Sequence, residues 1–487
     1  MSVEDAFGDI RLRVSKILGI KTAHHVILHP SGTDAELTAL LAGVNQARQL
    51  GCSGVVNIVV GAKEVGSNTA TAAGGKHFSK HFPVSSTNNP EDEAAQGGNM
   101  FSPVAVSANG IENGIQVVEI AARLDDGSMV PNFDALVLQT MENATLSCKS
   151  SGESGPFFVL HVVDGSKLGS HITSRSLLKR ITCQYGDRVL FVLDACQART
   201  STGELDWYLA RNAVVLMTAS KFYGAPGFCA AALVPHKIAM AGLFIDTEPR
   251  EPGRPAVVSH NLGKYITKLE VPRDLEALRA TLPARPENVG LLLRWSCGVF
   301  EMDRFAKAGQ KGQQVIAWWV DGVRAVVRSK RPHVLLLRDT GCEKDETVPF
   351  PAADTFVGCV NSIVSFCVIT GASKGDGTPV KAPSTMSAVD LRRFHRWLTI
   401  DMEGVLPEAA TDDERRTARL RCFIGQPVDL GKLAVLRLAI SASLASDLAD
   451  GSRRLDEVLA DDGRVLDKIL LVKKYYGEFC AWDAGEL

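Results

Sequence analysis

Short apolar runs alternate with amphipathic stretches along the first half of the chain. The runs are rich in Val, Ile and Leu and are bounded by polar residues, which is typical of strands; they span residues 25–29, 54–61, 116–123, 157–163, 189–193 and 214–217. Helical stretches are expected at 135–149 and 174–185. Alternation of strand and helix indicates a parallel sheet, and runs that are apolar throughout fit strands covered on both faces. We therefore predict an α/β fold whose large domain is a mostly parallel sheet flanked by helices.

The two ends of the chain follow other patterns. Residues 1–24 predict a short amphipathic arm, because Ile10, Val14 and Leu18 fall on one face of a helix. A long helix is expected at 286–307, and the shorter strands and helices that follow predict a smaller C-terminal α/β domain. The predicted organisation is an arm, a large domain, and a linking helix with a small domain, with the limits 1–24, 25–290 and 291–487.

The composition argues against several classes of protein. A chain of 487 residues is long enough for two domains, and a formal net charge of -2 gives no indication of a nucleic-acid or membrane partner. No apolar run approaches the length of a membrane span, and the charged N-terminus lacks the apolar core of a signal peptide. The 11 cysteines include no CxxC pair, which favours reduced thiols over disulfides or a metal site. We expect a cytoplasmic protein that holds no metal.

Polar side chains appear abruptly where the last two of these predicted strands end. Asp194 and Gln197 follow the first of them, and Thr218, Ser220 and Lys221 follow the second. The carboxyl ends of strands in open α/β sheets are where ligands bind. A carboxylate and a lysine at one sheet edge, 27 residues apart, can hold pyridoxal phosphate (PLP). The amine forms a Schiff base and the carboxylate pairs with the pyridinium nitrogen, so that the ring acts as an electron sink.

A turn suited to a phosphate follows the first predicted strand, at Ser31, Gly32 and Thr33. Gly32 allows a tight turn, and the free N–H groups and dipole of the helix opened by Thr33 and Asp34 favour an anion. A plain helix N-cap by Thr33 explains the same residues without a ligand.

Three motifs together resemble a known family. D-A-C-Q at 194–197, T-A-S-K at 218–221 and Y-G-A-P-G at 223–227 look like the core of the class V aminotransferase group of fold-type I PLP enzymes, which includes cysteine desulfurases. The resemblance implies that Lys221 and Asp194 are catalytic and that Gln197 reaches the ring hydroxyl. It also implies phosphate contacts from the strand-end and helix-start residues, namely Ser31, Gly32, Thr33, Thr218 and Ser220. Ser220 stands where many members have His.

Other positions depart from the family or match it briefly. Many members have a Glu-His pair whose His stacks on the cofactor ring, whereas this chain has Glu64-Val65. His77 or Phe78 is therefore the candidate for stacking. The alternative is that His77 lies on the surface and Phe78 in the core. Asp164 or Ser166 stands where an Asn is common. Later, L-R-L-A-I-S resembles the family strand whose Arg binds the substrate carboxylate, which makes Arg437 the candidate; an Arg on an edge strand is the alternative.

The resemblance identifies the cofactor better than the reaction. It implies an amino-acid substrate, an external aldimine, an α-carbanion or quinonoid intermediate, and a homodimer. The departures favour a lyase or an enzyme that forms or cleaves carbon–carbon bonds, with an aminotransferase as the alternative. A cysteine desulfurase is less favoured, because Cys342 in R-D-T-G-C-E-K-D-E does not resemble the sulfur-accepting loop. A PLP-fold protein that only binds a partner is also disfavoured, because both Asp194 and Lys221 are present.

Overall fold

The chain forms two compact units. The computed structural model describes residues 2–79, 114–150, 152, 154–243, 259–337, 362–370 and 384–485. The first unit comprises Met1–Ala122, Pro131–Gly309 and Phe350–Cys359, and the second comprises Arg123–Val130, Gln310–Pro349 and Val360–Leu487.

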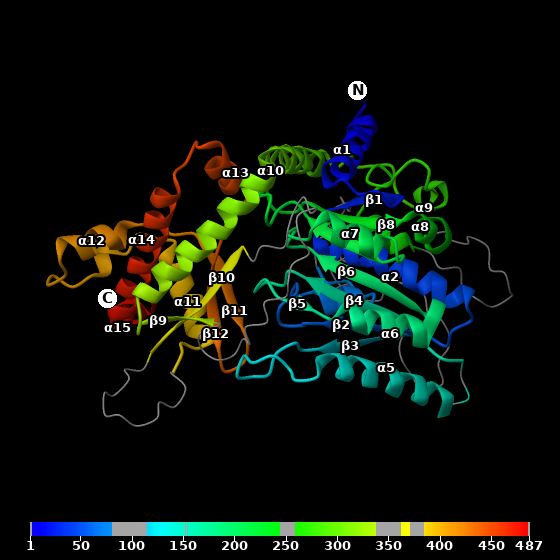
Figure 1. Cartoon of the computed structure of the whole chain (residues 1–487), viewed down its shortest axis with the longest axis horizontal. Helices are drawn as coiled ribbons and strands as arrows, with labels where there is room; N and C mark the ends of the chain where they lie inside the picture. The colour runs from blue at the N-terminus through cyan, green and yellow to red at the C-terminus, as the bar shows by residue number, and fades with distance from the viewer. Residues whose placement is uncertain are drawn as a thin grey trace. The chain divides into compact units, whose positions relative to one another are not determined.

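An eight-stranded sheet forms the centre of the first unit, in the order β1-β8-β7-β6-β4-β2-β3, with β5 paired to β4 (Figure 1). The strands are β1 His24–His29, β2 Val55–Val60, β3 Ile115–Ile120, β4 Phe157–Asp164, β5 His171–Ile172, β6 Val189–Ala195, β7 Val214–Thr218 and β8 Ala230–Pro235. β3, β2, β4, β6 and β7 run parallel, while β8 is antiparallel to both β7 and β1. The predicted α/β fold with a mostly parallel sheet is confirmed.

Helices accompany this sheet at the positions where the sequence changes from apolar runs to amphipathic stretches. They are α1 Val3–Leu18, α2 Gly32–Gln49, α3 Thr69–Ala73, α5 Phe133–Ser150, α6 Arg175–Tyr185, α7 Thr202–Leu209, α8 His236–Gly242 and α9 Glu276–Ala280, with 3-10 turns η2 Gly186–Arg188 and η3 Ser259–Lys264. Every residue of β2 and β4 is buried, as expected for strands covered on both faces.

Helix α2 packs closely on the centre of the sheet. Its N-cap is Ser31, whose hydroxyl accepts the N–H of Asp34. A Cβ placed at Gly43 would lie 2.5 Å from Cγ2 of Val159 on β4, so only glycine permits this approach. The apolar residues of α2 therefore join one core with alternate residues of the central strands, including Val159, Val192 and Leu216.

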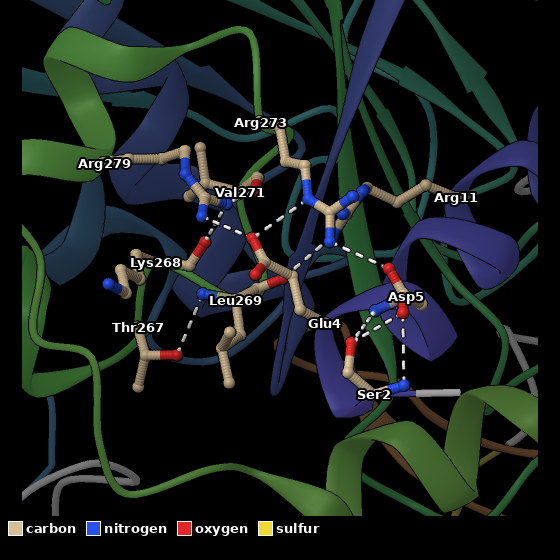
Figure 2. Close-up of polar contacts among 10 residues, drawn as sticks. All are labelled: Ser2, Glu4, Asp5, Arg11, Thr267, Lys268, Leu269, Val271, Arg273 and Arg279. Carbon is tan, nitrogen blue, oxygen red and sulfur yellow. Dashed lines mark hydrogen bonds and ion pairs between the residues drawn. The ribbon is translucent and has the colours of Figure 1, made fainter.

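The N-terminal helix α1 is held against residues 267–279 of the same unit. Its apolar face buries Phe7, Ile10, Val14 and Leu18, as predicted for an amphipathic arm. Figure 2 shows Glu4 of α1 between two arginines of that segment. The carboxylate Oε1 lies 2.6 Å from Nη2 of Arg279 and 3.3 Å from Nε of Arg273.

Backbone carbonyls complete this attachment. Nη1 of the buried Arg11 donates to the carbonyl oxygen of Leu269 at 2.9 Å. Nη1 of Arg279 donates to the carbonyl oxygens of Lys268 and Val271, at 2.6 and 2.7 Å (Figure 2). Burial, partly offset by the charges of Glu270 and Glu4, lowers the pKa of Arg11 to about 10. The arm is thus fastened by charged groups as well as by apolar packing.

The second unit contains a four-stranded antiparallel sheet in the order β11-β12-β10-β9. Its strands are β9 Val334–Leu336, β10 Ile363–Val368, β11 Gly425–Asp429 and β12 Ala434–Ala439. Its helices are α11 Ala388–Leu398, α12 Asp412–Arg419, α13 Ala442–Asp450, α14 Leu455–Lys474 and α15 Tyr476–Asp483, with the 3-10 turn η5 Glu403–Val405. The buried Lys468 of α14 donates to the carbonyl oxygens of Ile400 and Leu420, which follow the ends of α11 and α12.

The helix predicted at 286–307 is part of a longer element. α10 spans Val289–Ser329 and has a non-helical backbone at Gly309, with φ 53° and ψ -136°. The sequence-based prediction ended two residues before this glycine, and the helix resumes after it.

Candidate functional site

Three segments that are distant in the sequence meet where α2 begins. A Cβ placed at Gly32 would lie 2.6 Å from Sγ of Cys196 and 3.5 Å from Cγ2 of Thr218. The Thr218 hydroxyl donates to the carbonyl oxygen of Cys196 at 2.8 Å. The structure therefore brings the S-G-T, D-A-C-Q and T-A-S-K motifs together at the carboxyl edge of the sheet.

The half-buried Asp194 ends strand β6 and turns back on its own loop. Its Oδ1 accepts the N–H of Cys196 at 3.0 Å. Burial, then the charge of Asp194 and a hydrogen bond to it, and the charge of Glu36 raise the pKa of the Cys196 thiol, while Lys221 acts in the opposite direction. The hydrogen bond from Cys196 therefore places Asp194 beside the loop that contacts the start of α2.

Lys221 is exposed in the turn that follows β7, and Ser220 before it is half-buried. An arginine that the sequence analysis did not single out stabilises this region. Nη1 of Arg199 donates to the backbone oxygen and to Oε1 of Gln197, both at 3.0 Å, and the guanidinium lies 5.3 Å from the ring centroid of Phe222. Arg199 thus connects the loop after β6 to the residue that follows Lys221.

The start of α2 offers N–H groups to an anion but also carries an acid. The Ser31 hydroxyl accepts the N–H of Asp34 at 3.2 Å and donates to its Oδ2. Burial, opposed by the bonds from Ser31, raises the pKa of Asp34 to about 6. A phosphate on the N–H groups of Gly32 and Thr33 would be favoured by the helix end, and least opposed when Asp34 is protonated.

His77 is buried rather than on the surface. Its Nδ1 is 2.9 Å from the hydroxyl of Tyr265, and the two rings are stacked with centroids 5.9 Å apart. The ring of Phe78 also packs against Tyr265, at 5.2 Å. Burial and the charge of Asp34 raise the pKa of Tyr265. His77 is therefore buried against Tyr265, and its stacking role stays a prediction.

The positions that replace common family residues at the ends of β2 and β4 are occupied by protein contacts. The Ser166 hydroxyl donates to Oε2 of the buried Glu64 at 2.6 Å. Asp164 forms an ion pair with His171 of β5. The first pair ties the loop after β2 to the loop after β4, and the second ties the end of β4 to β5.

Arg437 lies on β12 in the second unit, whereas the other predicted site residues belong to the first. Its Nε and Nη2 donate to the carbonyl oxygen of Gln426, at 3.2 and 2.9 Å. Burial lowers its pKa. The predicted contact with a substrate carboxylate is neither supported nor opposed by these bonds, and Cys342 lies outside the described residues.

Two buried charged residues close to the site were missed by sequence reasoning. Nε2 of His161 on β4 lies 2.8 Å from Oε1 of Glu36 on α2, and the side chains are only 2% and 1% exposed. The signal was present, because His161 interrupts the apolar run F-F-V-L-H-V-V and a polar residue inside such a run needs a partner.

One cavity of the first unit lies away from the candidate site. Its volume is about 340 Å³, and residues at the amino end of β6 and the carboxyl end of α2 line it, including Val189, Leu190 and Gln49. None of the predicted site residues lines it. In the part of the chain that the structure describes, no helix is long and apolar enough to cross a membrane.

The chain was also compared with known proteins. No protein-family model matches it, and no curated protein matches it either. Among solved structures it is similar to Oryza sativa TDC with PLP and tryptamine, at 11% identity, a TM-score of 0.47, and coverage of 95% of this chain and 76% of that one.

Two further solved structures show the same level of likeness. Catharanthus roseus tryptophan decarboxylase in complex with L-tryptophan gives 13% identity, a TM-score of 0.45, and coverage of 94% and 75%. Sphingosine-1-phosphate lyase from Burkholderia pseudomallei K96243 gives 12% identity, a TM-score of 0.39, and coverage of 98% and 81%. At these TM-scores the likenesses carry no argument about the chain's activity, which has to be argued from its own residues.

Proposed function

We propose that this protein is a PLP-dependent enzyme of fold type I that acts on an amino-acid substrate. One observation carries the proposal: the start of α2, the loop after β6 and the end of β7 converge on Cys196, which donates a hydrogen bond to Asp194, and Lys221 follows the end of β7 by three residues. A phosphate-binding helix start, a carboxylate and a lysine are the groups that this cofactor requires.

Each residue has a distinct task in this proposal. Asp194 pairs with the pyridine nitrogen, and Gln197, held by Arg199, reaches the ring hydroxyl. Thr218 and Ser220 assist the α2 start in binding the phosphate, while Lys221 binds the cofactor covalently and then moves the proton at the substrate α-carbon. Arg437 holds the substrate carboxylate with two parallel hydrogen bonds. The bound cofactor supplies an electron sink for charge that develops at that carbon.

The reaction we favour is a lyase reaction or the formation or cleavage of a carbon–carbon bond. Transamination is the alternative, and membership of the class V aminotransferase group rests on the motifs at 194–197, 218–221 and 223–227. We also propose a homodimer, from the resemblance, and a cytoplasmic location, from cysteines that include no CxxC pair. Light scattering of the purified protein tests the dimer, and product analysis separates lyase from transaminase.

The decisive experiment is an absorption spectrum with added PLP, followed by borohydride reduction and peptide mass spectrometry. We expect a long-wavelength band and a PLP-modified peptide that contains Lys221. Lys221→Ala should lose both, whereas Lys237→Ala, which removes another exposed lysine of the same unit, should keep both. A band and modified peptide that persist in Lys221→Ala would refute the proposal. A panel of amino acids then identifies the substrate class by the shift of the band.

A further inference from the structure

The pair formed by Glu36 and His161 is more deeply buried than the predicted catalytic residues. Oε1 of Glu36 and Nε2 of His161 are 2.8 Å apart, which is an ion-pair distance, but neither these two atoms nor Oε2 of Glu36 meets a partner in hydrogen-bond geometry among the residues described. Two charges removed from water are costly unless they compensate each other. The carboxylate can only accept, so the imidazole beside it must supply the positive charge or a proton.

The strand register places this pair behind Asp194. His161 pairs with Val192 and Val163 pairs with Asp194 in the parallel ladder between β4 and β6. Residues two apart on a strand, and residues paired in a parallel ladder, point to the same face of a sheet. His161 and Asp194 are therefore diagonal neighbours on one face, which α2 covers through Gly43 and Val159.

The charges that face His161 all favour its protonated form. Burial lowers the pKa of His161, but Glu36 from α2 and Asp194 from β6 outweigh it, so that the pKa is raised. Cys196, which follows β6, senses both of these carboxylates. The group beside Asp194 is thus a histidine whose protonation both carboxylates favour, and Glu36 lies 2.8 Å from its Nε2.

We propose that Glu36 and His161 are positioning residues for Asp194: the buried pair that they form places His161 behind the Asp194 carboxylate, on the same face of the sheet, and so holds that carboxylate for the pyridine nitrogen of PLP. This inference rests on the proposed function for the role of Asp194, but the charged state of the pair does not depend on a cofactor. Helix α2 then serves the site twice, through its first turn for the phosphate and through Glu36 for the nitrogen partner.

The first test uses the protein without added cofactor. Histidine titrations followed by NMR, with His161→Gln to assign the signal, should give a midpoint for His161 above the ordinary value near 6.5. Glu36→Gln should move that midpoint below 6.5, because burial is then opposed only by Asp194. His25→Gln, which removes another buried histidine at the amino end of β1, should leave it unchanged. A wild-type midpoint below 6.5 would overturn the proposal.

The second test measures the PLP dissociation constant between pH 6 and 8. We expect His161→Gln to weaken PLP binding by roughly tenfold (about 1.4 kcal/mol) at every pH. Glu36→Gln should weaken binding to the same extent only at high pH, because His161 is neutral there in this variant. The dissociation constant of each variant is divided by that of wild type at the same pH, so that the effect of Asp34 protonation on phosphate binding cancels. A Glu36→Gln ratio that does not change with pH would contradict the positioning role.

Two controls keep the outcomes separate. If Glu36→Gln fails to fold, the double variant Glu36→Gln/His161→Gln, which removes both charges, should fold and still bind PLP roughly tenfold more weakly; wild-type affinity in the double variant would overturn the proposal. If wild type binds no PLP at all, the proposed function fails, and the positioning role fails with it. The NMR titration alone would then still report whether the pair is charged.

Discussion

Cys196 makes three contacts that no other residue of the candidate site combines. Its thiol occupies the space in which a side chain at position 32 would begin, its carbonyl oxygen accepts from Thr218, and its N–H donates to Asp194. Two of these contacts use the backbone, so a substitution at 196 changes only the first and the interaction of the thiol with Asp194. This separation makes the contact between Gly32 and Cys196 testable by itself.

Gly32→Ala should destabilise the protein by roughly 1–3 kcal/mol, because the new methyl group collides with the Cys196 sulfur. Adding Cys196→Ala should recover most of this loss, since it removes the colliding atom and keeps both backbone bonds. Denaturant unfolding of the two single variants and the double variant measures the coupling. Gly8→Ala, in a helical position with open space, should be neutral or slightly stabilising. Simple additivity of the two changes would show that the atoms are not in contact.

Asp34→Asn should stabilise the protein at pH 7.5 and have much less effect at pH 4.5. The folded-state pKa of about 6 lies above the ordinary 3.8, so ionisation of Asp34 disfavours the fold, and wild-type stability falls as the pH rises between these values. The full difference corresponds to about 3 kcal/mol. Urea unfolding at the two pH values checks this, and an equal gain at both would contradict burial as the cause.

At the scale of elements, α1 is joined to residues 267–279 by groups that can be removed one at a time. Tyr265, which lies just before that segment, is in contact with His77. The arm therefore stabilises the segment next to Tyr265, although the arm itself supplies no predicted site residue.

Glu4→Gln should loosen α1 while leaving the rest of the unit folded. The variant loses its charge interaction with Arg273 and Arg279, which we expect to cost about 0.5–1 kcal/mol for a partly exposed network. Trypsin should then cleave after Arg13 or Lys16 faster than in wild type, since cleavage reports local opening. Asp9→Asn, on the same helix with only a 3.9 Å contact to Arg13, is the matched control. Equal cleavage rates for Glu4→Gln and wild type would show that apolar packing alone holds the arm.

At the scale of the whole molecule, the local pattern predicted the strands and the helices between them, and the motifs predicted which segments meet. The apolar strands were recognisable because a buried run is apolar whatever its partners are, whereas the short β5 and the polar β11 were not predicted. The antiparallel insertion of β8 between β1 and β7 was not predictable, since strand order depends on pairing between distant segments.

The same limit applied to the site. Ser31, Gly32 and Thr218 were found because turn and strand-end residues have local signatures. Glu36 and Arg199 were not, because a charged residue on a helix or in a loop usually faces water, and only their folded partners, His161 and Gln197, reveal otherwise.

Binding of PLP should protect the two units unequally. All predicted cofactor contacts belong to the first unit, and only the predicted substrate contact of Arg437 belongs to the second. Hydrogen exchange should therefore slow at residues 31–35 and 194–221 and stay unchanged in β10, β12 and α14. At a hundredfold excess over the dissociation constant the gain is about 2.7 kcal/mol. Pyridoxal without phosphate should protect residues 31–35 less. Equal protection throughout the second unit would contradict this assignment of contacts.

The buried pair beneath Asp194 also has a consequence for how this chain diverges. Loss of Glu36 or His161 alone leaves an uncompensated charge in the core, which costs about 3–5 kcal/mol, whereas their joint replacement by apolar residues is often neutral. Substitutions at positions 36 and 161 should therefore occur together in related chains. Descendants that have exchanged both for apolar residues would have lost the charge behind Asp194, and with it a reason to keep that aspartate.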